Sequence, residues 1–340
     1  MIKTSVIGSY PRYPKLIGSD FNPRWLLMSE NNDRWMQKKE KILFDEATEW
    51  AVEEQIETGL DIVTDGEQRR SNYILYHCQH LEGFDFKNRE ELICRGGKVK
   101  TIVPVIRGSI KAKNLFLADE FNFLKKLTDR DIKITIPGPL TIIDSIKDAY
   151  YHDEKKLAFD LARAINKEVQ LLVKAGSRII QIDEPCSIRE PEKFKEYGLE
   201  ALELCFEGAE KISKEVHICR GYPNNKKDTK AEIERYGQVI ELLSKSKIDK
   251  IAIEDAHEHL DLEVFSKFGN KGCILGVVDI GNEKIETVEE IINRVKQVLT
   301  VLKPEQLTLA PDCGLLLLKP EIAKAKLKNI VLAAEQLNNL

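Results

Sequence analysis

Eight short apolar runs alternate with stretches of helical periodicity along the 340-residue chain, and this order predicts an α/β fold of the (βα)8, or TIM-barrel, class. Most runs are apolar throughout and rich in β-branched residues, which is typical of parallel strands that helices cover. An open doubly wound sheet is the alternative, but it rarely needs eight regular strands. The predicted strands are Thr4–Ser9, Asp61–Thr64, Ile132–Ile136, Arg178–Ile182, Glu215–Cys219, Lys250–Ile253, Cys273–Asp279 and Leu307–Ala310.

Two segments exceed what a bare barrel of about 250 residues needs. The first, Pro11–Lys39, predicts an N-terminal loop extension after the first strand. The second, Gly83–Ile110, predicts a β-hairpin insertion, because apolar runs flank the Gly96-Gly97 pair. No internal repeat, low-complexity tract or linker interrupts the chain, so residues 1–340 are read as a single domain.

The last two predicted helices show their periodicity most clearly. One runs from about Pro320 to Gln336 and opens with a proline, which suits a first helical turn. Both apolar stripes would face the sheet, as the outer ring of helices in a barrel requires. The stripe of the earlier helix consists of Val288, Ile291, Ile292, Val295, Val298, Leu299 and Leu302.

The composition indicates a globular chain and excludes several classes of partner. Hydrophobic residues make up 42% and charged residues 32%, with a formal net charge of −4. This balance gives no electrostatic case for nucleic acid or an anionic membrane, and no apolar run approaches a membrane span. The start does not have the pattern of a signal peptide, and seven scattered cysteines argue against a disulfide framework. We therefore expect a cytoplasmic protein without nucleic-acid or membrane partners.

Four residues at the ends of three predicted strands have the chemistry of a metal site. His217 and Cys219 are two apart on one strand, so their side chains point to the same side. Glu254 and Cys313 follow two later strands, and the carboxyl ends of barrel strands converge on one face. One imidazole, two thiolates and one carboxylate suit tetrahedral Zn2+. The sequence therefore predicts a zinc centre at this face.

Each of these residues also has a purely structural interpretation. His217 and Cys219 could be a hydrogen-bonded histidine beside an inert buried thiol, and Cys313 could be a structural thiol as well. Glu254 could be a solvated acid at the start of a helix. Three neighbours are rival ligands for its position: Asp255, His257 and His259.

Three acids are predicted at the same face: Glu67, Asp183 and Glu184. Acids at a strand-to-helix turn often only cap the helix. Glu67 and Asp183 nevertheless come from opposite sides of the ring, so together they could hold an ammonium group. Backbone donors around Ser9 could hold a carboxylate. Such a combination would bind an amino acid beside the metal.

Seven ordered motifs resemble the catalytic half of cobalamin-independent methionine synthase, and the resemblance covers essentially the whole chain. The matching segments are Ile7–Pro11, Asp65–Glu67, Gly138–Ile142, Gln181–Pro185, His217–Cys219, Glu254 and Pro311–Gly314. The zinc ligands that this resemblance implies are His217, Cys219, Glu254 and Cys313. The homocysteine contacts that it implies are Ser9, Glu67 and Asp183.

Two departures from the family pattern lie on the methyl-donor side. The family has a histidine at the end of strand seven that is thought to help protonate the folate leaving group, and this chain has Gly281 there. Ser145 replaces the tryptophan that packs against the folate ring in the family. The large N-terminal half of the plant and bacterial enzyme is also not part of this sequence. The chain thus resembles the short branch, for which a methylated corrinoid protein is a possible donor.

The combined reading is a zinc-dependent thiol methyltransferase that converts homocysteine to methionine. A thiolate is the nucleophile, and zinc deprotonates a bound thiol, so the substrate sulfur would attack a methyl carbon in line. We expect Glu254 and Asp183 to act in catalysis, Glu254 by leaving the metal and Asp183 by holding the substrate. The alternatives are a zinc-dependent alkyltransferase acting on another thiol such as coenzyme M, a structural zinc protein, a metal-free decarboxylase of the uroporphyrinogen type and a non-catalytic zinc- or thiol-binding protein.

Overall fold

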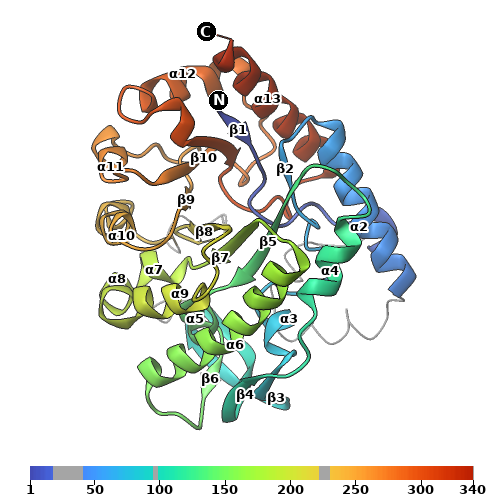
Figure 1. Ribbon diagram of the computed structural model, residues 1–340, viewed down its shortest axis with the longest axis vertical. Helices are drawn as coiled ribbons and strands as arrows, with labels where there is room; N and C mark the ends of the chain where they lie inside the picture. The colour runs from blue at the N-terminus through green and yellow to red at the C-terminus, as the bar shows by residue number, and fades with distance from the viewer. Residues whose placement is uncertain (18–40, 95–98, 222–229, 340) are drawn as a thin grey trace.

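The computed structural model describes residues 1–17, 41–94, 99–221 and 230–339, and all eight predicted strands form one parallel sheet within them. A bridge between Ser5 and Ile62 joins the first and second strands of the chain, which lie at the two ends of the spatial order, and so closes the sheet. The predicted (βα)8 barrel is therefore confirmed (Figure 1). In spatial order the strands are β1 (Lys3–Thr4), β11 (Leu307–Pro311), β10 (Gly272–Val278), β9 (Lys250–Ile253), β8 (Ser213–Ile218), β7 (Ile179–Asp183), β5 (Asp131–Pro137) and β2 (Ile62–Val63).

The helices form the outer layer of the barrel (Figure 1). The predicted last helix is α13, and the striped helix before it is α12, which begins at a capping box formed by Thr287 and Glu290. No helix in the described ranges is both long and apolar enough to cross a membrane. The helices are α2 (Lys41–Glu57), α3 (Leu75–Cys78), α4 (Leu117–Leu124), α5 (Pro139–Asp144), α6 (Glu154–Ala175), α7 (Cys186–Arg189), α8 (Pro191–Lys193), α9 (Leu199–Cys205), α10 (Arg235–Ser244), α11 (Leu262–Ser266), α12 (Val288–Val298) and α13 (Pro320–Asn338).

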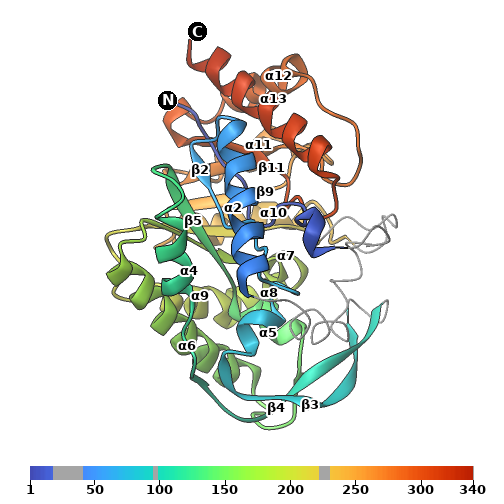
Figure 2. The same cartoon turned by 90° about the vertical axis from the view of Figure 1, so that its right-hand side faces the viewer.

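The predicted hairpin insertion is confirmed as the antiparallel pair β3 (Leu81–Cys94) and β4 (Val99–Ala112). A short strand, β6 (Lys147–Asp148), pairs in parallel with β4 and makes a second, three-stranded sheet. Figure 2 shows the hairpin extending away from the lower end of the barrel. The Gly96-Gly97 turn lies outside the described residues, as does most of the Pro11–Lys39 extension.

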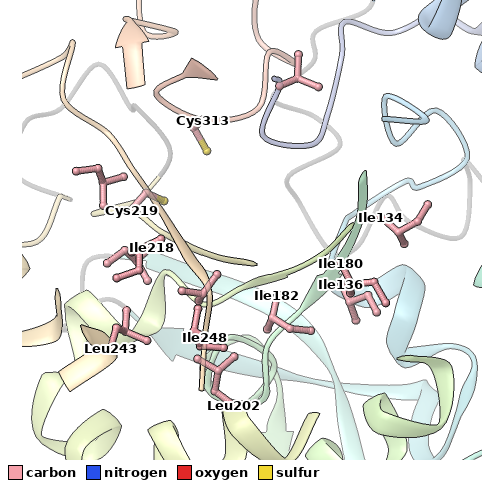
Figure 3. Packing of buried hydrophobic residues seen from close by; sticks show 14 of the residues in the cluster. Ile134, Ile136, Ile180, Ile182, Leu202, Ile218, Cys219, Leu243, Ile248 and Cys313 are labelled. Carbon is pink, nitrogen blue, oxygen red and sulfur yellow. The ribbon is translucent and has the colours of Figure 1, made fainter. Parts of the chain in front are cut away.

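The two faces of the barrel strands differ in chemistry. Outward-facing isoleucines, including Ile134 and Ile136 on β5 and Ile180 and Ile182 on β7, belong to the main hydrophobic core (Figure 3). The residues that alternate with them point into the barrel, and on β5, β7 and β8 these are polar and buried: Lys133, Thr135, Gln181, Asp183, Glu215 and His217. On the opposite side the interior is apolar: Ile7, Ala252, Ile274 and Ala310. The barrel therefore contains a polar half that leads to its mouth.

The first strand is shorter than predicted, because β1 ends at Thr4 and only a bridge at Ser5 continues it. Beyond that point the backbone bonds to interior side chains instead of a neighbouring strand. The Val6 carbonyl accepts from Lys133 Nζ at 3.2 Å, and the Ile7 carbonyl accepts from Gln181 Nε2 at 3.0 Å. The segment thus bends over the barrel interior and carries Ser9 to the mouth.

Candidate metal and substrate site

Three of the four predicted metal ligands meet at the carboxyl ends of the strands. His217 and Cys219 lie at the end of β8, and Cys313 follows β11 on the other side of the barrel mouth. One ligand atom from each residue lies within 4.8 Å of the other two, and all three residues are buried. Figure 3 shows Cys219 and Cys313 on segments that face one another above the isoleucine layer. The strand spacing and the barrel closure together bring these residues into one cluster.

The orientation of His217 suits a metal ligand. Its Nδ1 lies 3.1 Å from Asp183 Oδ1, while its Nε2 is buried and has no hydrogen-bond partner among the described residues. An unpaired buried polar atom is costly unless something binds it. Metal-ligating histidines characteristically donate the other ring N–H to a carboxylate, as here. The residues present therefore fit a metal cation, and one imidazole with two cysteine sulfurs is a zinc-like donor set.

The pKa values of the two cysteine thiols are shifted in opposite directions. A hydrogen bond from the Cys313 thiol lowers the pKa of Cys219 well below its usual value, and the nearby His217 charge adds to this effect against the opposing effect of burial. The same hydrogen bond raises the pKa of Cys313, and so does burial. Burial lowers the pKa of His217, but the Cys219 charge and the Asp183 hydrogen bond outweigh it and raise that pKa to about 10. The lowered pKa favours the thiolate form of Cys219, which is the form that binds metals.

Glu254, the fourth predicted ligand, is not part of the three-residue cluster. Its Oε1 accepts from Arg220 Nε at 2.9 Å, and its Oε2 accepts from Lys230 Nζ at 2.7 Å. Burial would raise the pKa of this carboxyl, but the two cations outweigh burial and lower it. The carboxylate still lies near enough to influence the pKa values of Cys219 and Cys313. Its role as a ligand stays a prediction.

The rival ligands have other partners. Asp255 forms two 2.7 Å hydrogen bonds with Arg294, and His259 Nδ1 lies 2.7 Å from the Asp255 carbonyl. His257 Nδ1 lies 3.3 Å from Asp279 Oδ2. Within the described ranges, none of the three rivals joins the cluster of His217 and the two cysteines.

Both predicted substrate-binding acids are buried, and Asp183 contacts the cluster through His217. Glu67 Oε1 accepts from Thr135 Oγ1 at 2.9 Å and from Arg70 at 3.2 Å. Burial raises the pKa of Glu67, Arg70 opposes this, and the charge of Asp183 raises it further. Gly8 is required here, because a Cβ at that position would lie 2.7 Å from Glu67 Oε1. Glu67 and Asp183 thus influence one another electrostatically, and their joint contact with one bound group stays a prediction.

The third acid, Glu184, caps a helix. Its Oε1 accepts from the Thr141 amide at 2.7 Å and its Oε2 from the Leu140 amide at 3.1 Å, at the start of α5. A Cβ on Gly138 would lie 2.2 Å from Glu184 Oε2, so this glycine permits the close approach. Glu184 therefore serves the start of α5, which follows the neighbouring strand β5, whereas the sequence suggested a cap for the helix after its own turn.

Ser9 lies against the loop that carries Cys313. Its carbonyl accepts from the Leu315 amide at 2.8 Å, and a Cβ on Gly314 would lie only 2.1 Å from Ser9 Oγ. The predicted carboxylate-binding segment is therefore adjacent to a cysteine of the cluster. This places both predicted parts of the substrate site at one mouth.

Several residues of the site were not found from the sequence. Lys230 and Arg220 hold Glu254, and Gln181 donates to Asp183 Oδ1 at 2.7 Å. Burial raises the pKa of Tyr73, and the charges of Asp183 and of Cys219 raise it further. Only Gln181 had a sequence signal, its spacing of two from Asp183 on one strand.

Comparison with known proteins identifies the family. The family model of the cobalamin-independent synthase catalytic domain matches residues 2–336. The chain belongs to this family. This member is 33% identical to the methionine synthase of Saccharolobus solfataricus over 337 residues, which is 97% of this chain and 93% of that protein. It is 32% identical to the methionine synthase of Sulfolobus acidocaldarius over 336 residues, with 97% and 91% covered.

Solved structures agree with this assignment. The B12-independent methionine synthase from Shewanella sp. W3-18-1, in complex with selenomethionine, has a TM-score of 0.87 and 29% identity over 99% of this chain and 98% of that one. A methyltransferase from Methanosarcina mazei, at a TM-score of 0.59 and 14% identity over 99% and 94%, shares the fold alone. The chain is therefore an enzyme, a methyltransferase of the methionine synthase type.

We predict that Glu254→Gln costs about 3 kcal/mol of unfolding free energy at pH 7, because it leaves two nearly buried cations without their carboxylate. The folded-state pKa of Glu254 is lowered, so its stabilising effect is present above the usual value near 4.5 and is lost as pH falls through the lowered value. Urea unfolding at neutral and acidic pH measures both effects.

Glu258→Gln is the matched control for this prediction. Glu258 binds Arg220 Nη2 at 2.9 Å, but its side chain is 55% exposed, whereas that of Glu254 is 4% exposed. Removing an exposed partner costs less than about 1 kcal/mol. Equal losses in the two variants would contradict the importance that we give to the buried pair.

Proposed function

We propose that this enzyme methylates the sulfur of homocysteine at a zinc centre held by His217, Cys219 and Cys313. The observation that supports this proposal most strongly is the meeting of a histidine and two cysteines beside two buried acids. The metal would bind the sulfur of a thiol substrate, and the acids would bind the ammonium group of an amino acid. When bound, zinc would keep the substrate sulfur as a thiolate, the nucleophilic form.

The chain's own residues would bind and orient the amino-acid part of the substrate. Glu67 and Asp183 would accept from the ammonium group, and donors near Ser9 would hold the carboxylate. Asp183 has an advantage for this role, because among the described residues the hydrogen-bond partners of its carboxylate are the Gln181 amide and the His217 ring rather than a lysine or arginine. The buried surroundings strengthen these electrostatic contacts by excluding water.

Glu254 would complete the metal site as its fourth ligand and would leave it when the substrate sulfur arrives. Arg220 and Lys230 are alternative partners for Glu254, and they would offset the free-energy cost of a buried carboxylate that has left the metal. In the described arrangement Glu254 is bound to these cations. Its movement between the cations and the metal is the catalytic role that we assign to it.

For the methyl donor we propose a methylated corrinoid, as free cofactor or carried on a protein. Gly281 and Ser145 stand where the family places the residues that serve a folate. Gly281 donates its amide to Asp279, and the Ser145 hydroxyl donates to the Thr141 carbonyl. A reduced corrinoid is a stable leaving group, so no acid is needed on the donor side.

Methyltetrahydrofolate is the second candidate donor, and one observation favours it. His257 Nδ1 lies 3.3 Å from Asp279 Oδ2. Asp279 directly follows β10, at the strand end where the family places its histidine. A histidine oriented by a carboxylate is a suitable proton donor for a folate leaving group. The histidine would then come from the neighbouring strand end.

The alternative functions considered from the sequence explain these observations less well. The curated relatives are named methionine synthases, which favours homocysteine over another thiol such as coenzyme M. A structural zinc protein or a passive zinc- or thiol-binding protein would not need the buried acids Glu67 and Asp183 beside the cysteines. A metal-free decarboxylase would not need the cysteines.

We predict that purified protein carries about one zinc per chain, and that Cys219→Ser and Cys313→Ser each lose most of it. Metal content after dialysis, determined by elemental analysis, tests this. Cys273→Ala is the control, because Cys273 is a buried thiol on β10 outside the cluster and its variant should keep its zinc. Full zinc retention in both serine variants would refute the site.

We predict that Glu67→Gln weakens homocysteine binding by roughly 2 kcal/mol, about 30-fold in Kd, and leaves zinc content unchanged. The amide keeps an oxygen for Thr135 but loses the charge that pairs with ammonium. Binding is compared with that of an alkanethiol lacking the amino group, which should not respond. The control is Glu120→Gln, which removes another acid that influences Arg70. It should leave the binding of homocysteine and of the alkanethiol unchanged.

We predict that methylcobalamin or a methylated corrinoid protein gives faster single-turnover methylation than methyltetrahydrofolate. With a corrinoid donor, His257→Ala should leave the rate unchanged, and His80→Ala serves as a control histidine distant in sequence. If methyltetrahydrofolate is the efficient donor, His257→Ala should lower its rate by about 10²–10⁴-fold. Efficient turnover with methyltetrahydrofolate and none with any corrinoid would refute the donor assignment.

A further inference from the structure

A buried ion pair occupies the polar half of the barrel, below the cysteine and histidine cluster. Lys133 Nζ lies 3.0 Å from Glu215 Oε2, and neither side chain is exposed to solvent. The same ammonium donates to Gln181 Oε1 at 3.1 Å and to the Val6 carbonyl at 3.2 Å. Buried ion pairs contribute little net stability compared with apolar residues of the same size. The charged pair therefore calls for an explanation other than stability.

The ammonium of Lys133 determines which way the Gln181 amide faces. A lysine ammonium only donates hydrogen bonds, so the amide oxygen must face Lys133. The amide nitrogen then faces the other way and donates to Asp183 Oδ1 at 2.7 Å and to the Ile7 carbonyl at 3.0 Å. The reverse orientation would set the NH2 group against an ammonium and the oxygen against a carboxylate.

The orientation of the Gln181 amide in turn determines which ring nitrogen of His217 carries the hydrogen. A carboxylate oxygen only accepts hydrogen bonds, so Asp183 Oδ1, which accepts from Gln181, also accepts from His217 Nδ1, 3.1 Å away. The Nδ1 atom therefore holds a hydrogen, so Nε2 is the nitrogen that would give up its hydrogen and offer a lone pair when a metal binds. Strand register supports this row, because Asp183 is paired directly with His217 and Gln181 directly with Glu215.

We propose that Lys133 and Gln181 are positioning residues for the metal site, which fix the ring orientation and tautomer of His217 through Asp183. This inference rests on the proposed zinc function, which it extends to two residues that do not touch the metal. Partners of this kind typically change metal affinity about 10–100-fold when they are removed. The row of Lys133, Gln181, Asp183 and His217 then explains why the barrel interior is charged.

The test compares Gln181→Met with Gln55→Met. Methionine matches glutamine in size and removes the donor to Asp183, while Lys133 keeps Glu215 and the Val6 carbonyl. Gln55 is an equally buried glutamine, and its amide bonds to the Ala51 and Thr64 carbonyls instead. Any general effect of losing a buried amide appears in both variants, and only Gln181→Met breaks the row.

The first measurement is the exchange rate of the His217 Nδ1–H proton, observed by NMR on histidine labelled with 15N and assigned by its loss in His217→Gln. It requires no added metal. We expect protection in the unaltered protein and in Gln55→Met, and clearly faster exchange in Gln181→Met. The second measurement is zinc affinity by chelator competition, where we expect a loss of about 10–100-fold in Gln181→Met alone.

Lys133→Met combined with Glu215→Gln removes both charges of the fully buried pair and leaves only the part-exposed Lys250 without its Glu215 contact, and it serves if Gln181→Met does not fold. We expect the same direction of change in both measurements. Unchanged proton exchange, or unchanged zinc affinity, in the folded variants overturns the inference while the proposed function stands. If the unaltered protein protects its Nδ1–H but binds no zinc, the proposed function fails instead, together with the metal role of the row.

Discussion

The hydrogen bond between Asp183 and His217 is the contact on which the rest of the site depends. The two residues are direct neighbours on β7 and β8, so strand register alone sets their separation. The bond leaves His217 Nε2 unpaired next to two cysteine sulfurs, and it uses Asp183 Oδ1. The proposed metal site and the proposed amino-acid site would thus share one carboxylate.

Charge balance explains how one barrel mouth holds so many acids. Most of them have their own compensating partners: Arg70 for Glu67, Arg220 and Lys230 for Glu254, Arg294 for Asp255, the α5 amides for Glu184, and three loop amides for Asp312. Burial of an uncompensated carboxylate would be costly, and each partner offsets that cost. Asp183 differs, because among the described residues the hydrogen-bond partners of its carboxylate are an amide and an imidazole. A cationic substrate group is the partner that would complete it.

The residues proposed to bind the thiol are more deeply buried than those near the proposed methyl-donor position. The cysteines and His217 lie within the closed mouth, above a core of tightly packed isoleucines (Figure 3). His257 and Asp279 lie nearer the surface, and His257 is partly exposed. A thiol acceptor is small and can be enclosed, whereas a corrinoid or a folate is large and must approach from outside. The family membership fixes the first half of the reaction more firmly than the second.

The sequence by itself determined the barrel, because each strand is a local apolar run with a clear boundary. It also indicated His217, Cys219 and Cys313, since residues at strand ends must converge on one face. Only the tertiary structure decided the partners of Glu254, the cap role of Glu184 and the row from Lys133 to His217. Those contacts join residues tens of positions apart, such as Lys133 and Gln181. Their directions depend on which side chains face inward across neighbouring strands, which local sequence periodicity does not encode.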